Sequence, residues 1–157
     1  MSEATIRRFY AAFARLDGEA MQACYAADAR FDDEAFSLHG AAEVGGMWRM
    51  LCSATRGNPA ALAHWRLELG DITPHGAHWE AHYLFGPRGR PVHNRIDARF
   101  EFDDQGLITR HHDRFDFAAW ARQALGAPGW LLGRTAWLRG PVRAQAAASL
   151  RRFLRPS

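Results

Sequence analysis

Residues 95–116, RIDARFEFDDQGLITRHHDRFD, combine imidazoles and carboxylates with a pattern of alternating polarity that predicts two strands joined by a polar turn at DDQG. Side chains two residues apart share one face of a strand, so His111 and Asp113 point the same way, together with Thr109 and Phe115. An imidazole beside a carboxylate can act as a general base and its polar partner. The alternative is structural: Asp113 bonds a neighbouring group and fixes the end of the strand.

Other histidines are candidates for metal binding. His78 and His82 share one face of a predicted strand, and the segment from His111 to Asp113 could join them. The sequence contains no tight ligand motif such as HExxH, and a catalytic zinc ion needs three convergent ligands. We therefore expect no metal ion and no cofactor.

Four aromatic residues are candidates to line a ligand cavity: Trp48, Trp65, Trp79 and Phe100. Aromatic walls suit a flat or apolar ligand. For any single one of them, an ordinary place in the core is the competing interpretation.

The elements that would position these residues follow from periodicity. Apolar residues from Ile6 to Leu16 recur at helical spacing, and Asp17 is a suitable N-cap for a short second helix. A short strand in ARFDDEAF and a third helix, Ala41–Cys52, precede a run of four strands. These four are AHWRLELGDIT, HWEAHYLFG, VHNRIDARFEFDD and LITRHHDRFD, followed by a helix in FDFAAWARQALG, a break at GAPGW and a last helix after Pro141. This order predicts an α+β fold.

Composition narrows the classes of function. The chain has 157 residues, which suggests one domain with a real core. All 20 basic residues are Arg, and the absence of Lys excludes Schiff-base chemistry by a side-chain amine. Cys24 and Cys52 fall in apolar segments of helical pattern, so we expect two buried thiols rather than a disulfide.

Charge and hydropathy bear on location and partners. No apolar run is long enough for a membrane span, and the start, MSEATIRR, lacks the apolar region of a signal peptide. We therefore expect a cytoplasmic protein. From Phe117 onward the chain carries seven Arg and no acid, but these Arg are spaced apart. That spacing favours a solvated helix face over contact with nucleic acid or a membrane.

Three segments resemble the nuclear transport factor 2-like superfamily, and within it the SnoaL-like and ketosteroid-isomerase-like branch. They are IRRFYAAFARLDGEAMQACYAADARFDDE, GAAEVGGMWRML and FEFDDQGLITRHHDRFD, and the likeness covers roughly residues 4–125. It implies a cone: a curved antiparallel sheet wrapped around the N-terminal helices, with an apolar pocket at the open end. A SnoaL-like cone domain would span residues 1–125, and residues 126–157 would form a C-terminal helical extension packed on it. The resemblance also implies a homodimer that pairs through the outer face of the sheet.

The resemblance to ketosteroid isomerases assigns roles to particular positions. YAADARFDD matches the motif that carries the general base, which places Asp33 in that role; the alternative is a solvated turn Asp. The tyrosine that hydrogen-bonds the developing enolate falls on Phe9, with Tyr10 one step along the helix. The protonated Asp of that family, a worked case of a carboxyl kept neutral by its site, falls on Ala98, with Asp97 one residue away.

The segment HDRFD also resembles limonene-epoxide hydrolases, in which the Asp matching Asp113 belongs to an Asp-Arg-Asp set that activates water. In HWEAHYLF, the places of the Arg and the other Asp are taken by Trp79 and Ala81, so the set is incomplete. Asp116, just before FAAWARQAL, is expected to cap the following helix.

These observations leave two functional classes. The first is cofactor-free acid/base catalysis on a hydrophobic small molecule, of isomerase, cyclase or hydratase type, carried by Asp33, His111 and Asp113. The second is a ligand-binding or dimeric interaction module that uses the same fold without turnover.

Overall fold

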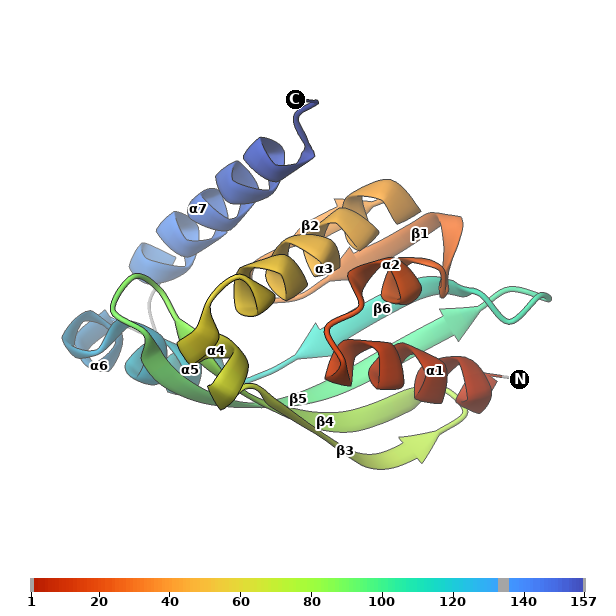
Figure 1. Cartoon of the computed structure of the whole chain (residues 1–157), viewed down its shortest axis with the longest axis horizontal. Helices are drawn as coiled ribbons and strands as arrows, with labels where there is room; N and C mark the ends of the chain where they lie inside the picture. Colours follow the sequence, from red (N-terminus) through yellow and green to blue (C-terminus); the bar gives the residue numbers. More distant parts are fainter. Residues whose placement is uncertain (1, 133–135, 157) are drawn as a thin grey trace.

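The computed structural model describes residues 2–132 and 136–156, in which one curved sheet of six strands is covered by helices (Figure 1). The strand order is β2-β1-β6-β5-β4-β3, and every neighbouring pair is antiparallel except β1 and β6, which are parallel. The strands are β1 (Tyr25–Asp32), β2 (Ser37–His39), β3 (Arg66–Thr73), β4 (Gly76–Phe85), β5 (Arg90–Phe102) and β6 (Ile108–Arg114). The α+β cone expected from the sequence is confirmed.

The helices lie on one face of the sheet and beyond one end of it (Figure 1). They are α1 (Ser2–Ala14), α2 (Gly18–Gln22), α3 (Ala41–Arg56), α4 (Pro59–His64), α5 (Phe117–Leu125), α6 (Ala127–Leu132) and α7 (Ala136–Leu154). Asp17 and Asp116 cap α2 and α5 as predicted, by accepting hydrogen bonds from the backbone N–H of Ala20 and Ala119. Gly126 ends α5 with a positive φ of 70°.

Three helical details differ from the sequence prediction. Helix α4 was not expected; the side chain of Asn58 caps it, and Pro59 occupies its first turn, where a missing N–H costs nothing. The predicted break at GAPGW is the short helix α6. The last helix begins at Ala136, so Pro141 lies inside α7 and does not start it.

The core lies between the sheet and helices α1–α3. On α1 the residues at helical spacing, Ile6, Phe9, Tyr10 and Phe13, are all buried. Cys24 and Cys52 are buried free thiols, as predicted. Helix α7 packs along α3, where Leu150 is buried.

A β-bulge changes which residues of β6 face the core. Glu101 pairs with Arg110 and Phe102 with Ile108, so Thr109 is an extra residue without a partner in β5. The bulge puts both Ile108 and His111 inside, and Thr109 lines a hollow on the outer face instead. The predicted alternation therefore holds for His111 and Asp113 but is wrong for Thr109.

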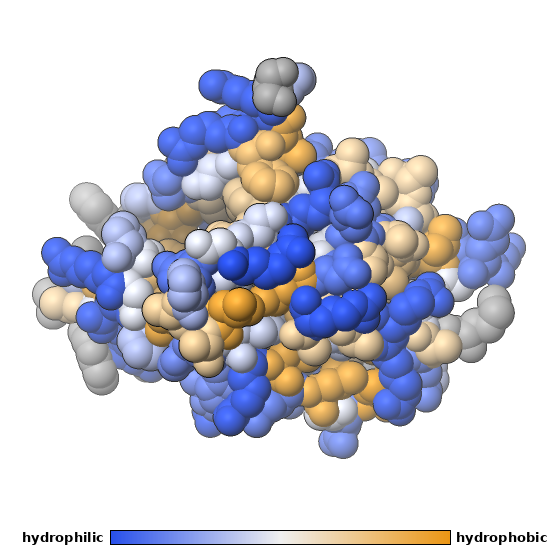
Figure 2. All heavy atoms as spheres, in the orientation of Figure 1, coloured by the Kyte–Doolittle hydropathy of each residue, from blue (hydrophilic) through white to orange (hydrophobic). Residues whose placement is uncertain are grey.

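The surface is predominantly hydrophilic on the face seen in Figure 2, with separate apolar patches between the charged residues. Among the described helices, none combines the length and the apolar character that crossing a membrane requires.

The contact between α2 and α3 depends on Gly18. A Cβ at this position would lie 2.7 Å from Arg49 Cα, a backbone atom that cannot move aside. We expect Gly18→Ala to lower the free energy of unfolding by about 1–3 kcal/mol through overpacking, measured by urea denaturation. Gly46→Ala is the matched control: a Cβ on Gly46 in α3 would first meet the end of the Leu154 side chain, which can turn aside, so the loss there should be smaller. Equal losses in both variants would contradict this explanation.

Candidate functional site: a buried Tyr–His–Asp chain

His111 lies at the centre of the interior, with no exposed surface. Strand β6 points it inward, opposite Phe100 of β5 and beside Phe31 of β1. The rings of Phe9, Phe31, Trp48 and Phe100 surround the imidazole with centroids 4.3–6.2 Å away. An imidazole held in so apolar a place needs its two nitrogens paired.

Both nitrogens of His111 are paired through a chain of buried side chains. Trp48 Nε1 donates to Tyr25 Oη at 2.9 Å, and Tyr25 Oη lies 2.7 Å from His111 Nδ1. His111 Nε2 lies 2.8 Å from Asp113 Oδ1. The Asp113 carboxylate can only accept, so Nε2 of His111 carries the proton and donates to it. Nδ1 of His111 is then the acceptor, and the Tyr25 hydroxyl donates to it.

Helical spacing placed Tyr10 on the apolar face of α1, and the structure buries it there. The resemblance placed the donor of the enolate hydrogen bond at Phe9, and one helical step of about 100° argued against Tyr10. In the structure both side chains are buried, because α1 is enclosed on a broad face. Tyr10 Oη and Trp79 Nε1 are buried and have no hydrogen-bond partner among the described residues.

The environment of Tyr10 points to a place for a polar atom. Burial raises the pKa of Tyr10 well above its ordinary value, and the charge of Asp113 adds to the rise. The Trp79 N–H offsets part of this rise by favouring the phenolate, although the two groups do not meet the geometry of a hydrogen bond. Buried polar atoms without partners are rare, and a water or a ligand oxygen commonly supplies the missing bond.

Asp33 follows β1 in the turn that leads to β2 and is partly buried. Its Oδ1 accepts hydrogen bonds from the backbone N–H of Ala35 and Phe36, both at 2.7 Å, so the predicted turn role is real. Even so, burial raises the pKa of the Asp33 carboxyl to about 7, against the two hydrogen bonds, and the charge of Asp113 adds to the rise.

Helix α7 closes over this turn. Arg143 donates to the backbone carbonyls of Asp33 and Glu34 at 3.2 and 3.0 Å, and Arg139 pairs with the Glu34 carboxylate at 3.2 Å. Two of the seven tail Arg therefore bind the turn that carries Asp33. No pattern in the sequence indicated this contact.

The groups that the sequence singled out thus gather around Asp113. Its charge contributes to raised pKa values of Tyr10, Tyr25 and Asp33, which come from α1, β1 and the turn after β1. His111 bonds it directly. Tyr25 and Trp48 complete the hydrogen-bond chain, and no pattern in the sequence indicated that Tyr25 takes part.

The four predicted wall residues divide into two groups. Trp48 and Phe100 pack on His111, and Trp79 packs against Tyr10 at 5.7 Å between ring centroids. Trp65 is only partly buried; its Nε1 donates to the carbonyl of Ala14, and its ring packs against Phe13. A ligand pocket between these residues stays a prediction.

Several other candidates lie on the outer face of the sheet. Asp97 is exposed there and pairs with His78, whereas Ala98 is buried directly opposite Asp113. His78 and His82 also face outward, away from His111, so they cannot join it around a metal ion. The places corresponding to the Arg and Asp of the epoxide hydrolases, Trp79 and Ala81, are buried and offer no carboxylate or guanidinium.

Comparison with known proteins agrees with this architecture. The SnoaL-like domain family matches residues 6–111, more than half of the chain. The chain belongs to this SnoaL-like family. No curated protein matches the sequence significantly.

Solved structures share the fold of this SnoaL-like protein at low sequence identity. A "putative polyketide cyclase" from Xanthomonas campestris pv. campestris has 22% identity and a TM-score of 0.60, with 78% of this chain and 96% of that chain covered. A "putative isomerase" from Rhodopseudomonas palustris has 17% identity and a TM-score of 0.59, covering 80% and 99%. The epoxide hydrolase/cyclase-like enzyme SalBIII, which acts in pyran ring formation in the polyether salinomycin, has 11% identity and a TM-score of 0.58, covering 73% and 89%.

Tyr25→Phe tests the hydrogen-bond chain. The substitution removes one hydroxyl and leaves both Trp48 Nε1 and His111 Nδ1 buried without a partner. We expect the free energy of unfolding to fall by about 1–3 kcal/mol, measured by urea denaturation, and the ¹⁵N shifts of the His111 ring to move. In Tyr83→Phe, which breaks a bond to Trp120 elsewhere, the His111 shifts should stay unchanged. Unmoved His111 shifts in Tyr25→Phe would refute the chain.

Asp33→Asn tests the raised pKa of Asp33. A folded-state pKa of about 7, against 3.8 as the ordinary value, means that the native state holds a proton between about pH 4 and 7 that the unfolded chain has lost. Stability therefore falls as the pH rises through this window. An Asn keeps the acceptor oxygen without the charge, so Asp33→Asn should be more stable than the natural chain at pH 8 by about 1–3 kcal/mol. This gain in stability should vanish near pH 4, where the natural Asp33 is protonated as well. Urea denaturation of both proteins at pH 4 and at pH 8 measures the difference. Equal stability of the two proteins at pH 8 would contradict the raised pKa of Asp33.

Proposed function

We propose that this SnoaL-like protein binds a hydrophobic small molecule in the interior of the cone and performs cofactor-free acid/base chemistry on it. The observation that carries the proposal is the group around Asp113: a carboxyl with a pKa of about 7, a buried hydroxyl without a partner and a fully paired His–Asp pair. Isomerisation, cyclisation and hydration all need a base of this kind and a donor for the oxygen that becomes negative.

Asp33 is the base in this proposal. A general base works best when its pKa lies near the working pH, because it is then both ionised in part and strong enough to take a proton. The pKa of Asp33 meets this condition at neutral pH. The hydrogen bonds from Ala35 and Phe36 to Oδ1 fix the carboxyl and leave Oδ2 as the oxygen to receive the proton.

Tyr10 and Trp79 are the donors. Their unpaired O–H and N–H belong to buried side chains packed against one another, so one ligand oxygen could accept from both. Such preorganised donors stabilise negative charge as it develops on a substrate oxygen. They replace, from different positions, the pair of donors that the resemblance to ketosteroid isomerases placed at Phe9 and Ala98.

His111 and Asp113 act as positioning residues. The chain from Trp48 through Tyr25 and His111 fixes one oxygen of Asp113, and the resulting charge raises the pKa of Tyr10 and of Asp33. Without that charge Asp33 would be a weaker base. The hydrogen bond between His111 and Asp113 therefore serves both interpretations of Asp113. It pairs a buried carboxylate, and it holds in place the charge that raises the pKa of Tyr10 and of Asp33.

The names of structural neighbours agree with this class of reaction. They include a "putative polyketide cyclase", a "putative isomerase" and an epoxide hydrolase/cyclase-like enzyme. The second candidate function is a non-catalytic binding module, favoured by one observation: the aromatic rings leave His111 no contact with solvent. Homodimerisation belongs to this proposal as well and is checked by light scattering.

Ring opening of 5-nitrobenzisoxazole tests the proposed base. This probe is flat and apolar; a base removes the proton on carbon 3, the N–O bond breaks, and a coloured nitrophenolate forms without any cofactor. We expect the natural chain to accelerate the reaction above the rate with acetate, with a rate that rises with pH through about 7 as Asp33 loses its proton. Asp33→Asn should lose the acceleration, and Tyr10→Phe should slow it by about 10-fold or more because the leaving oxygen loses a donor.

Asp32→Asn is the matched control, since Asp32 is the preceding carboxylate, lines a hollow on the outer face and bonds Ser37. It should react like the natural chain. Equal rates in the natural chain and Asp33→Asn would refute the assignment of the base. Binding of the probe, detected by quenching of Trp fluorescence, without acceleration would favour the binding module.

A further inference from the structure

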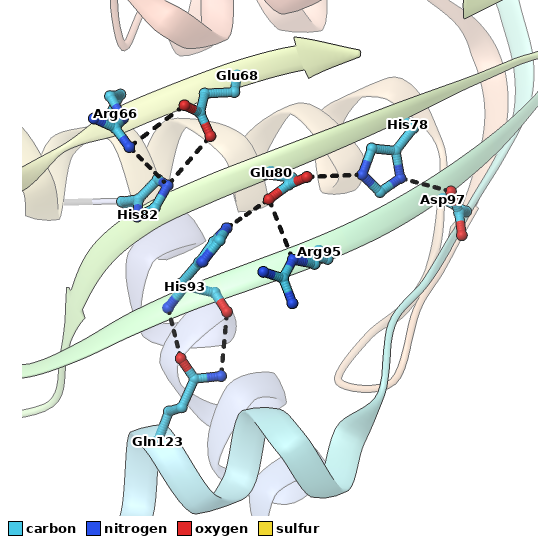
Figure 3. A network of polar contacts seen from close by, with 9 residues as sticks. All are labelled: Arg66, Glu68, His78, Glu80, His82, His93, Arg95, Asp97 and Gln123. Carbon is cyan, nitrogen blue, oxygen red and sulfur yellow. Dashed lines mark hydrogen bonds and ion pairs between the residues drawn. The ribbon is translucent and has the colours of Figure 1, made fainter. Parts of the chain in front are cut away.

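The outer face of β3, β4 and β5 carries a polar cluster separate from the interior site (Figure 3). Strand alternation points Glu68, His82 and His93 outward, one from each strand, while the residues between them face the core. His82 and His93 are directly opposite across the β4–β5 pair, and their rings stack at 4.0 Å with an interplanar angle of 19°.

We propose that Glu68, His82 and His93 bind a divalent transition-metal ion of the zinc class. One ligand atom from each residue lies within 4.8 Å of the other two. Tetrahedral coordination at ordinary Zn–N and Zn–O lengths brings ligand atoms to roughly 3.3–3.5 Å from one another. The ligand atoms therefore need to converge by more than 1 Å, and because the lone pairs of two stacked imidazoles run nearly parallel, one ring must also rotate about its side-chain bonds to face the ion.

The chemistry of the donors selects the ion. Two imidazole nitrogens and one carboxylate oxygen suit Zn²⁺, Co²⁺ or Ni²⁺ and not Ca²⁺ or Mg²⁺, which prefer oxygen alone. The side chains are partly exposed, with 51% for Glu68, 21% for His82 and 33% for His93, so solvent reaches the place of a fourth ligand. Three protein ligands and a water complete a tetrahedral site.

The surroundings hold His93 in position. The side chain of Gln123 on α5 accepts from the backbone N–H of His93 at 2.8 Å and donates to its carbonyl at 3.1 Å. Glu80 lies 2.6 Å from His93 Nε2 (Figure 3). A carboxylate bonded to one nitrogen of a ligating histidine fixes the ring and makes the other nitrogen a better ligand.

Arg66 competes for the same place. Its Nη2 lies 3.3 Å from His82 Nε2 and 3.4 Å from Glu68 Oε1, so a positive group already sits against two of the three ligands. Its side chain is 63% exposed and free to turn into solvent when a metal ion enters. Removing this guanidinium should strengthen metal binding, an effect opposite to that of removing a ligand.

Titration of the full chain, free of any polyhistidine tag, tests the site with Zn²⁺ against a chromophoric chelator and with Co²⁺ by visible absorption. We expect one ion per chain, a Co²⁺ spectrum of tetrahedral type and a Zn²⁺-dependent rise in melting temperature, since the ion would link three strands. The pair of changes His82→Ala and His93→Ala should weaken Zn²⁺ binding by about 10-fold or more, and Arg66→Ala should strengthen it several-fold.

His112→Ala is the control for adventitious binding, because His112 is exposed on the same face but on β6, two strands from β4. It should bind Zn²⁺ like the natural chain. The proposal is overturned by absence of stoichiometric binding, by equal binding in the double variant and the natural chain, or by weaker binding in Arg66→Ala. Because Arg66→Ala alters only an exposed side chain, a folding defect cannot account for that last result.

Discussion

The hydrogen bond between His111 and Asp113 sets conditions that the rest of the interior must meet. Both side chains are almost without solvent contact, and a buried polar group left unpaired costs free energy comparable to a lost hydrogen bond or more. The second nitrogen of His111 therefore needs Tyr25, and the oxygen of Tyr25 accepts from Trp48. Ala98, directly across from Asp113 on β5, puts only a methyl group at that position.

The order of elements could be predicted because it rests on local signals. Asp17, Asp116 and Gly126 mark helix ends through their own side chain or backbone, and alternation of polarity marks β4 and β5. Where the prediction was wrong, the local signal was ambiguous. Pro141 is read as a helix start, yet the helix begins five residues earlier; Asn58 with Pro59 is a cap signal inside a segment short enough to pass for a loop.

The composition of the site was less predictable, since it depends on distances across the fold. The sequence places His111 and Asp113 on one face of a strand, and the structure agrees. It cannot show that Tyr25, 86 residues before His111, supplies the partner of Nδ1. It also cannot locate a bulge at Thr109, whose effect is to put Ile108 and His111 on the same side of the sheet. Helical spacing placed Tyr10 on the apolar face of α1, but it could not show that the Tyr10 hydroxyl lies in the interior without a hydrogen-bond partner among the described residues.

The two faces of the sheet are linked by the backbone that they share. On β4 the buried Trp79 lies between the outward His78 and Glu80. The register that points His78 and Glu80 outward therefore also points Trp79 into the core. The contacts that hold Glu80, His82 and His93 in register across β4 and β5 therefore also keep the Trp79 ring packed against Tyr10. Since side chains alternate with a period of two, a slip of one residue would exchange the two sets of groups completely. The charged network on β4 and β5 and the paired chain on β1 and β6 therefore each oppose a slip of their own strands, because polar atoms would be left buried and unpaired if the register moved.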